Sequence, residues 1–288
     1  MCTCAFVTES DFPRIVKTFD EAFADYFLEM RTSSERWLYN RCVKNGVAFD
    51  CSVGAFDGGR MVGITLIGLD DWQGVPAAFD AGTGIVPDYR GRALARKMFE
   101  LAVPRLKQRG VRRFLLEVLQ VNEPAIKAYR KSGFEVTREL DCYELTRDDA
   151  RPRSTGPGPC EIRPITRDQI DRFRDHVDWQ PSWENSFSSI HRIPDDIVAF
   201  GAFDHSICVG ELVYYPLLNW IVSLVVRKDD RRRGIAGKLL THFVNQLEPE
   251  IDSVKLINVD HSDEGMTAFL HHCGFRLYTR QYEMALTL

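Results

Sequence analysis

The chain of 288 residues lacks the features that mark several classes of protein. It has no apolar run long enough to span a bilayer, no low-complexity tract, and no cysteine pair at the CxxC spacing of zinc and redox sites. Its first residues lack the basic-then-apolar layout of a secretory signal. We therefore expect a cytoplasmic protein with no membrane association, no bound metal and mostly buried, reduced cysteines.

Excess positive charge is also missing. The formal net charge is −4 and the pI about 6.0, so the global field does not attract nucleic acid. Positive charge is local instead, in one cluster around Arg90–Lys97 and a second around Lys228–Lys238. A length of 288 residues is comfortable for two domains of roughly 140 residues each.

The two basic clusters belong to a repeat. Arg90-Gly91-Arg92-Ala93-Leu94-Ala95 and Arg231-Arg232-Arg233-Gly234-Ile235-Ala236 each lie between a strand-like run and an amphipathic pattern, and a Gly-Phe pair follows each at the same separation. A loop of small residues that opens a helix binds anions, because unpaired backbone N–H groups and the helix dipole converge there. The sequence therefore predicts a phosphorylated cofactor and a fold that occurs twice.

Hydrophobic periodicity predicts the elements of the first half. Helices are expected after Thr8 and over 35–43, 93–108 and 124–131, strands over 52–56, 61–67, 78–86 and 114–118, and a hairpin from Phe134 onward. Asp57-Gly58-Gly59 predicts a hairpin turn. Gly82 and Gly84 in the third strand indicate either a bulge or a close backbone approach by a ligand.

The second half repeats this order in abbreviated form. Strands are expected over 162–165, 197–203, 209–215, 220–226 and 254–259, with helices from Asp168, up to Gln246 and from Asp263. Between the halves, 148–159 holds three prolines, two glycines and four charged residues, which is typical of a linker. We therefore predict an α+β fold with domains at 1–147 and 160–288, each a mixed, mainly antiparallel sheet flanked by helices.

These motifs resemble the GCN5-related N-acetyltransferase (GNAT) superfamily in a tandem two-domain form. The loop pattern Arg/Gln-x-x-Gly-x-Gly/Ala is met in full by Arg231–Ala236, whereas Arg90–Ala95 has Ala93 where glycine is usual. Downstream, the order and spacing of the following residues also match the superfamily: Leu116, Glu117, Val118, Asn122, Ala125, Ile126, Tyr129, Gly133 and Phe134.

The resemblance implies acetyl-coenzyme A as co-substrate and direct attack by an amine, without an acyl-enzyme. The cofactor-binding residues that it implies are Gly84, Ile85 and Val86 for the pantetheine arm, Arg90, Gly91, Arg92, Ala93, Leu94 and Ala95 for the pyrophosphate, Asn122, and in the second half Arg231, Arg233, Gly234 and Ala236. Asn122 is either a helix cap, a contact to the pantetheine arm, or both.

The resemblance also implies an acid and a base. Tyr129 is placed to protonate the leaving thiolate, and Glu117 stands where amino-terminal protein acetyltransferases of the superfamily have a base. Asp80 and a bound water are alternatives for the base, since Glu117 could instead pair with a nearby basic residue. On the acceptor side, acidic and aromatic residues such as Glu21, Asp25, Tyr26 and Glu29 suit a cationic amine but also simple solubility.

In the second half, register puts Asn258, Asp263 and Leu270 where Glu117, Asn122 and Tyr129 stand in the first. We therefore expect the first half to be the catalytic one, and the second either to bind coenzyme A or only to shape the substrate cleft. The predicted function is an acetyl-coenzyme A-dependent N-acetyltransferase acting on a small-molecule or peptide amine. The alternative is a catalytically silent coenzyme A-binding sensor or assembly module. Acceptor identity and oligomeric state cannot be read from the sequence.

Overall fold

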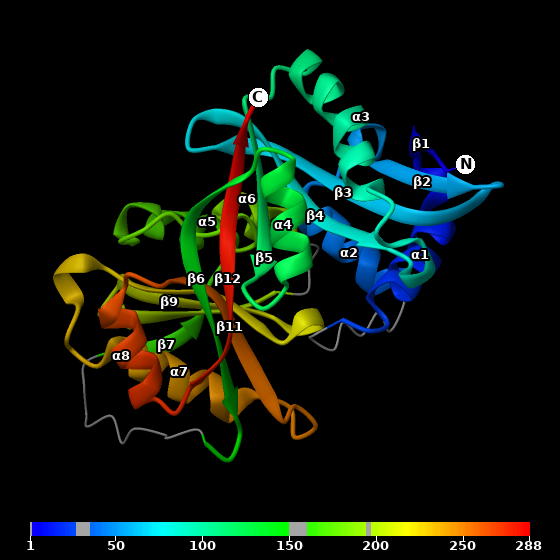
Figure 1. The fold of residues 1–288 in the computed structure, drawn as a ribbon. Coiled ribbons are helices and arrows are strands. Elements are labelled where there is room, and N and C mark those ends of the chain that lie inside the picture. Colours follow the sequence, from blue (N-terminus) through cyan, green and yellow to red (C-terminus); the bar gives the residue numbers. More distant parts are fainter. Residues whose placement is uncertain (1, 27–34, 150–159, 194–196) are drawn as a thin grey trace. The chain divides into compact units, whose positions relative to one another are not determined.

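A computed structural model describes residues 2–26, 35–149, 160–193 and 197–288 (Figure 1). By internal contacts the chain divides into two units: unit 1 is Met1–Arg138 with Tyr282–Leu288, and unit 2 is Glu139–Gln281. These units differ from the predicted domains 1–147 and 160–288 at two segments. Residues 139–147 belong to unit 2, and residues 282–288 belong to unit 1. The predicted linker lies, from residue 150 on, outside the described residues.

Unit 1 is built on a mainly antiparallel sheet in the order β1-β2-β3-β4-β5. Its strands are β1 (Thr3–Phe6), β2 (Val53–Asp57), β3 (Arg60–Trp72), β4 (Val75–Ile85) and β5 (Arg113–Leu119), to which parts of β6 (Glu135–Thr146) and β12 (Arg276–Thr287) add. The predicted Asp57-Gly58-Gly59 turn joins β2 to β3, and both glycines have the positive φ that such a turn requires (55° and 85°).

Four helices accompany this sheet: α1 (Phe12–Phe23), α2 (Glu35–Asn45), α3 (Leu94–Gln108) and α4 (Glu123–Lys131). Helix α1 begins after Thr8, whose side chain forms a capping box with Asp11, and buries one apolar stripe against β3 and β4. Helix α3 ends before Gly110, which has the positive φ typical of a helix terminus. Each predicted helix of this half is therefore present.

Unit 2 repeats the plan with shorter helices. Its strands are β7 (Cys160–Pro164), β8 (Val198–Asp204), β9 (Ile207–Tyr215), β10 (Trp220–Val226) and β11 (Ser253–Asp260), and its helices are α5 (Arg167–Ile170), α6 (Phe187–Arg192), α7 (Ile235–Gln246) and α8 (Glu264–His272). The sheet order β11-β10-β9-β8-β7 matches that of β5 back to β1. A core cluster that includes Tyr143, Leu239, Phe243 and Leu270 lies within this unit.

The prediction of a hairpin from Phe134 onward was wrong. Residues Glu135–Thr146 form one strand, β6, whose first part belongs to unit 1 and whose remainder pairs with β11 in unit 2. The chain lacks a turn signal in this stretch, and the strand that completes unit 1 beside β6 comes from the end of the chain, β12. The sequence reading also missed β1 and α6, both short, with β1 largely exposed.

None of the described helices is long and apolar enough to cross a membrane.

Candidate functional site

The two central strands of unit 1 separate midway along their length. Parallel pairing between β4 and β5 covers only Ala77–Asp80 against Arg113–Leu116, while β4 continues to Ile85. The backbone of β4 beyond Asp80 is therefore unpaired on the side of β5, an edge to which an extended ligand can add. Gly84 and Ile85, predicted to bind the pantetheine arm, lie on this edge.

The glycines of β4 have two structural roles. The register with β3 shifts between Leu66 and Ile67, which makes the predicted bulge. The close approach at Gly84 is made by α1, because a Cβ there would lie 2.7 Å from the Phe23 ring and 2.9 Å from the Ala22 Cβ. Gly84 is thus required by the packing of α1 over the strand.

The predicted anion loop of unit 1 has the geometry of an anion site. Gly91 and Ala93 both have positive φ (75° and 57°), and Ala93 is the N-cap of α3. Within the described residues, the backbone N–H groups of 91–96 have no intramolecular acceptor. Unpaired donors at the N-terminus of a fifteen-residue helix favour a phosphate.

The loop of unit 2 has the same backbone conformation, but its glycine is at the second of the two positions with positive φ, whereas in unit 1 the glycine is at the first. Arg232 and Gly234 have positive φ (63° and 77°), where unit 1 has Gly91 and Ala93. Each loop thus keeps one glycine and places one non-glycine residue in the left-handed region, which costs about 1 kcal/mol. From the sequence, Ala93 is identified as a departure from the loop pattern. That Gly91 also requires a positive φ could be seen only in the structure.

The leading arginine of each loop is held within the protein. Arg90 forms a bidentate ion pair with Asp25 (2.7 Å for both contacts) and donates to the carbonyls of Ala22 and Ile85. Arg231 forms a single-contact ion pair with Asp178 (2.6 Å) and donates to the carbonyls of His176 and Val226. Both guanidinium groups therefore fix the loop to the segment after the first helix, and we infer an indirect role in cofactor binding.

The next arginines are less restrained in unit 1 than in unit 2. Arg92 donates to the Asp88 carbonyl and stacks on Tyr89, and it has no carboxylate partner among the residues that the structure describes. Arg233 is paired with both Asp204 and Asp230. Arg92 thus has a charge available for a bound anion.

We expect the double variant Arg90→Ala/Arg92→Ala to raise the acetyl-coenzyme A dissociation constant at least tenfold. One substitution releases the loop, and the other removes a charge-assisted contact of about 1.5–3 kcal/mol. Isothermal titration calorimetry measures the change, with Arg14→Ala, an exposed arginine on α1, as the matched control. Unchanged affinity in the double variant would show that the loop does not bind the cofactor.

A buried polar network lies where β4 and β5 separate. The Tyr129 hydroxyl, from α4, donates to Asp80 Oδ2 (3.3 Å), which also accepts from Thr83 Oγ1 (2.8 Å). Asp80 Oδ1 accepts from the Gly82 N–H (3.1 Å), and Asp80 and Tyr129 are both buried. The structure therefore places Asp80 and Thr83, rather than Glu117, next to the predicted acid. Thr83 was missed, since a threonine in a strand carries no signal of its own.

Burial dominates the proton affinities of this network. It raises the pKa of Asp80 to about 6, although hydrogen bonds from Thr83, Gly82 and Tyr129 act in the opposite direction. It also raises the pKa of Tyr129 well above its usual range, with the nearby Asp80 charge adding to the effect. Because a carboxyl group with a pKa of about 6 lies beside a phenol that stays protonated, we interpret Asp80 and Tyr129 as a candidate acid-base pair.

Two further predicted residues border the network. The Asn122 side chain accepts from the Ala125 N–H (3.3 Å), so its predicted role as helix cap is confirmed. It also hydrogen-bonds Tyr26, whose pKa is raised mainly by burial and also by Asp80. Tyr26 and Asn122 thus link the end of α1 to the start of α4. Glu29 lies outside the described residues.

Glu117 is partly buried on β5, and no hydrogen bond joins it to Tyr129 or Asp80. Its neighbour Leu116 packs in the same cluster as Tyr129, and side chains alternate along a strand, so Glu117 faces the opposite side of β5. Its role as base stays a prediction.

In unit 2 the network is replaced by aliphatic side chains. When residues are counted along the sequence from each arginine loop, Asp80, Thr83 and Tyr129 of unit 1 correspond to Ile221, Leu224 and Leu270 of unit 2. All three residues of unit 2 are buried. The bulge also recurs, as a register shift between Ile221 and Ser223. The fold at this position is therefore shared between the units, and the acid-base pair is not.

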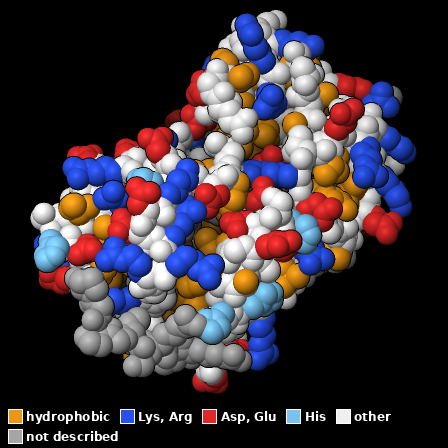
Figure 2. Space-filling view, turned by 90° about the vertical axis from the view of Figure 1, so that its left-hand side faces the viewer, with side chains coloured by type: hydrophobic (Ala, Val, Ile, Leu, Met, Phe, Trp, Pro, Cys, Tyr) orange, Lys and Arg blue, Asp and Glu red, His pale blue; other side chains and the backbone are white. Residues whose placement is uncertain are grey.

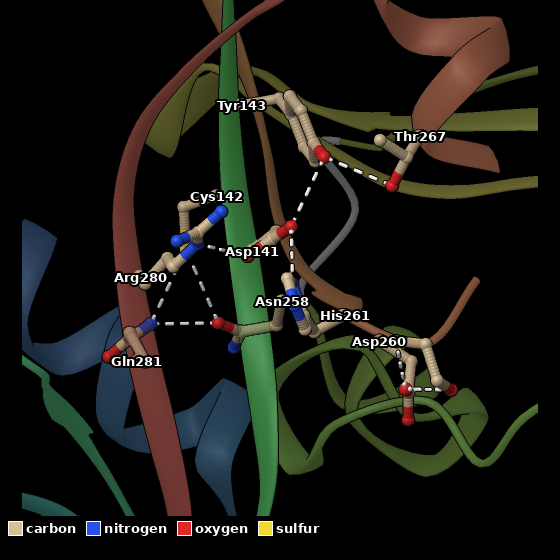
Figure 3. Close-up of polar contacts among 10 residues, drawn as sticks. Asp141, Cys142, Tyr143, Asn258, Asp260, His261, Thr267, Arg280 and Gln281 are labelled. Atoms are coloured by element: carbon tan, nitrogen blue, oxygen red, sulfur yellow. Dashed lines mark hydrogen bonds and ion pairs between the residues drawn. The ribbon is translucent and has the colours of Figure 1, made fainter. Parts of the chain in front are cut away.

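The position of Glu117 is taken in unit 2 by a structural amide. Asn258 is fully buried in β11, donates to Ser182 Oγ (3.0 Å) and accepts from Gln281 Nε2 (2.7 Å). Figure 3 shows this amide beside a cluster in which Asp141 accepts from Arg280, His261 and Tyr143. Because both oxygens of Asp141 are engaged and Asn258 carries no titratable proton, we interpret this cluster as structural.

Unit 2 nevertheless contains a cavity of about 740 Å³. Its lining includes the loop residues Arg231, Arg232, Gly234 and Ala236 at one part and β10 residues from Ile221 to Val226 at another. The predicted cofactor residues of the second half are thus brought together, with Arg233 on the outer side of the loop. A cavity of this size suits a small organic ligand.

Charge on the surface is mixed. On the face that Figure 2 shows, Lys and Arg side chains alternate with Asp and Glu. The basic clusters seen in the sequence are thus partly neutralised, as in the pairs Arg96–Glu100 and Arg233–Asp204.

Comparison with known proteins agrees with this geometry. Curated relatives include N-alpha-acetyltransferase 30 of Schizosaccharomyces pombe (31% identical over 97 residues, 33% of this chain and 65% of the relative) and mycothiol acetyltransferase of Corynebacterium aurimucosum (36% over 56 residues, 19% and 18%). The chain thus spans less than two thirds of the length of these relatives.

Solved structures show the same fold at low identity. A tandem GNAT protein from the clavulanic acid biosynthesis pathway is 17% identical, with a TM-score of 0.76 over 100% of this chain and 98% of its own. A GCN5-related N-acetyltransferase from Sphaerobacter thermophilus is 15% identical, with a TM-score of 0.71 over 99% and 95%. The model of the acetyltransferase (GNAT) family matches twice, at residues 16–134 and 162–275, and on this ground the chain belongs to the GNAT family, with one copy of the fold in each half.

Proposed function

We propose that this protein is an acetyl-coenzyme A-dependent N-acetyltransferase that transfers acetyl to a primary amine in unit 1. The observation that supports this most is the buried Asp80–Thr83–Tyr129 network, together with its replacement by Ile221, Leu224 and Leu270 in unit 2. A buried carboxyl group and phenol are expensive to keep in a core, so their presence where β4 and β5 separate, at positions that are aliphatic in unit 2, favours a catalytic role for unit 1.

The residues of unit 1 suit the co-substrate that the family uses. The unpaired N–H groups of 91–96 would hold the pyrophosphate, and the open edge of β4 at Gly84, Ile85 and Val86 would hold the pantetheine arm. Acetyl-coenzyme A, when bound, supplies the activated acetyl group. Backbone N–H groups near Ile85 would stabilise the oxyanion of the reaction.

The proton transfers follow from the network. The attacking amine must lose a proton, and Asp80 near its pKa of about 6 accepts one at neutral pH. Tyr129 donates its proton to the departing thiolate, and its own hydrogen bond to Asp80 lets the carboxyl group restore that proton. This relay avoids a free tyrosinate, which the raised pKa of Tyr129 disfavours. Glu117 and a bound water are the alternatives to Asp80 as the base.

The acceptor is proposed as a class only. The curated relatives are named for an N-alpha-acetyltransferase, for mycothiol and, in Streptomyces lavendulae, for streptothricin acetylation, so both peptide amino groups and small amines are represented. A screen of peptides with free amino termini and of small amines, read by thiol release from acetyl-coenzyme A, tests the proposal. No amine-dependent thiol release in this screen would favour the silent coenzyme A-binding module instead.

The division of roles between the units gives a further expected result. Arg231→Ala/Arg233→Ala should disturb the second loop but leave kcat within about twofold, because the proton-exchanging residues lie in unit 1. Steady-state turnover at saturating acetyl-coenzyme A measures this, with a thermal melt to show that unit 2 remains folded. A folded variant without turnover that still binds acetyl-coenzyme A in unit 1 would reverse the assignment.

A further inference from the structure

Unit 2 contains a buried carboxyl group that the proposed function does not use. Glu211, in β9, is fully buried. Its Oε1 accepts from Ser223 Oγ (2.8 Å), whereas Oε2 is buried and has no hydrogen-bond partner among the described residues. A buried carboxyl oxygen without a hydrogen bond destabilises a fold, so its presence calls for a ligand or a partner.

Ser223 connects this carboxyl group to the cavity of unit 2. Ser223 lines the cavity, on a stretch of β10 where the neighbours Ile221, Val222, Leu224 and Val225 are aliphatic. Glu211 is the ladder partner of Val225, which also lines the cavity, so both residues face the same side of the sheet. That side is opposite α7, because a Cβ on the preceding Gly210 would meet Ile235 and Leu239 of that helix.

The same positions of unit 1 are filled and apolar. Ile64 occupies the position of Glu211, and Gly82 and Gly84 those of Ser223 and Val225, in the equivalent register. In unit 1, the Phe19 and Phe23 rings of α1 pack directly over the two glycines. The equivalent segment of unit 2 is shorter: it consists of the four-residue α5 and the six-residue 3₁₀-helical turn Asp171–His176, whose last residue lines the cavity. The Glu211–Ser223 pair is therefore a specific property of unit 2.

The charges around Glu211 do not supply a counter-ion. Asp171, from the turn after α5, is itself acidic and is paired with Arg174 and His191. Cys208 lies on the same strand as Glu211. The charges of Arg163 and Arg172 lower the pKa of the Cys208 thiol, but they do not shift the pKa of Glu211. The cavity lining adds the carboxylates Asp178, Asp230 and Asp263, each bonded to a side chain of the protein. It also includes Arg231, which is paired with Asp178, and Arg232, and neither guanidinium acts on Glu211.

We propose that the cavity of unit 2 is a binding site for a primary ammonium group, with the Ser223 hydroxyl as the direct acceptor and the Glu211 carboxylate behind it as the counter-charge. The rest of the ligand would be apolar, in keeping with the aliphatic wall of β10. The site is distinct from the acetyl-transfer network of unit 1 and does not depend on it.

Binding at this site releases a proton. Burial raises the pKa of Glu211 to about 8, and the nearby Asp171 adds to the effect. The empty site is thus mostly protonated at pH 7. An arriving ammonium keeps its own proton and favours the ionised carboxylate, so the Glu211 proton passes to the solvent. Roughly 0.9 proton per ligand is expected at pH 7, falling to about 0.1 at pH 9.

Calorimetry in two buffers of different ionisation enthalpy tests this on the full chain. The probes are n-hexylamine and 2-phenylethylamine, with the neutral 1-hexanol and 2-phenylethanol as matched ligands. We expect the amines to bind with proton release, and the alcohols to bind at least tenfold more weakly and without it. Glu211→Gln should abolish the proton release and weaken amine binding at least tenfold, and Ser223→Ala should weaken it as well.

The variant Asp80→Asn shows in the same assay which unit releases the proton. Asp80, with a pKa of about 6, is already ionised at pH 7 and contributes little proton release itself. Proton release that survives Asp80→Asn but not Glu211→Gln assigns the site to unit 2. Equal binding of amines and alcohols, no binding by either amine, or proton release that persists in Glu211→Gln would each overturn the proposal. A thermal melt of Glu211→Gln shows whether the variant is folded. We expect a higher midpoint than the parent at pH 7, because Glu211 must take up a proton when the parent folds and glutamine does not.

Discussion

Tyr129→Phe is expected to lower kcat by about 10²- to 10⁴-fold while the dissociation constant of acetyl-coenzyme A changes by less than about threefold. A residue that donates a proton only in the transition state affects the chemical step and not ground-state binding. The variant removes one hydroxyl, and its ring keeps the contacts with Phe99 and Phe134 (centroids 6.0 and 5.9 Å apart), so the core of unit 1 remains packed.

Stopped-assay turnover and calorimetric cofactor binding together measure this result. Tyr143→Phe provides a matched control, because Tyr143 is also a buried tyrosine that donates to an aspartate, but in the structural cluster of unit 2. Its turnover should stay within about twofold of the parent. If Tyr129→Phe turned over like the parent, water would be the acid and the network would have only a structural role.

Asp80→Asn is expected to lower kcat/KM by about 10²-fold or more and to remove the rise in activity that the parent shows as the pH passes through about 6. The base must be ionised to accept a proton, so activity in the parent increases above the Asp80 pKa of about 6. An amide of nearly the same shape keeps the contacts with Thr83 and Tyr129 but cannot accept the proton.

The same variant should be more stable than the parent at neutral pH. The pKa of Asp80 is raised from 3.8 to about 6, so between these values the native state holds a proton that the unfolded state has lost. The stability of the parent therefore falls as the pH rises through this window, by about 3 kcal/mol. The stability difference between Asp80→Asn and the parent should grow by a similar amount between pH 4 and pH 7, as measured by denaturant unfolding.

Glu117→Gln is the comparison that distinguishes the two carboxylates. If the acidic limb of the kcat/KM profile persists in Glu117→Gln and disappears in Asp80→Asn, Asp80 is the base. The opposite pattern would restore the assignment made from the sequence. A gain in stability with full activity in Asp80→Asn would contradict the catalytic role altogether.

Much of this fold could be predicted from the sequence because local signals and global topology agree. The Asp57-Gly58-Gly59 turn, the apolar stripe of α1 and the repeated arginine loops each have a short-range cause. The acid-base network could be predicted only in part. Tyr129 was found by resemblance, but its contact with Asp80 joins residues far apart in the chain and depends on where β4 and β5 separate.

Other features depend on packing that leaves no local pattern. Gly84 reads as a ligand approach in the sequence, although it is α1 that excludes a side chain there. Glu211 reads as an ordinary charged residue within an apolar strand, and only the register of β9 with β10 places it beside Ser223. Neither the continuous β6 nor the assignment of 282–288 to unit 1 has a signal within its own segment.

The membership of 282–288 in unit 1 affects how the protein is made. These residues contribute Met284 to the core of unit 1, and the Leu288 N–H donates to the Arg112 carbonyl at 2.9 Å. During synthesis the ribosome adds them only after the whole of unit 2, so the proposed catalytic unit cannot complete its sheet until translation has passed both halves. Nascent chains stalled before residue 282 would therefore lack the strand that completes the first unit, and a tag placed directly after Leu288 would bear on the first unit rather than on the second.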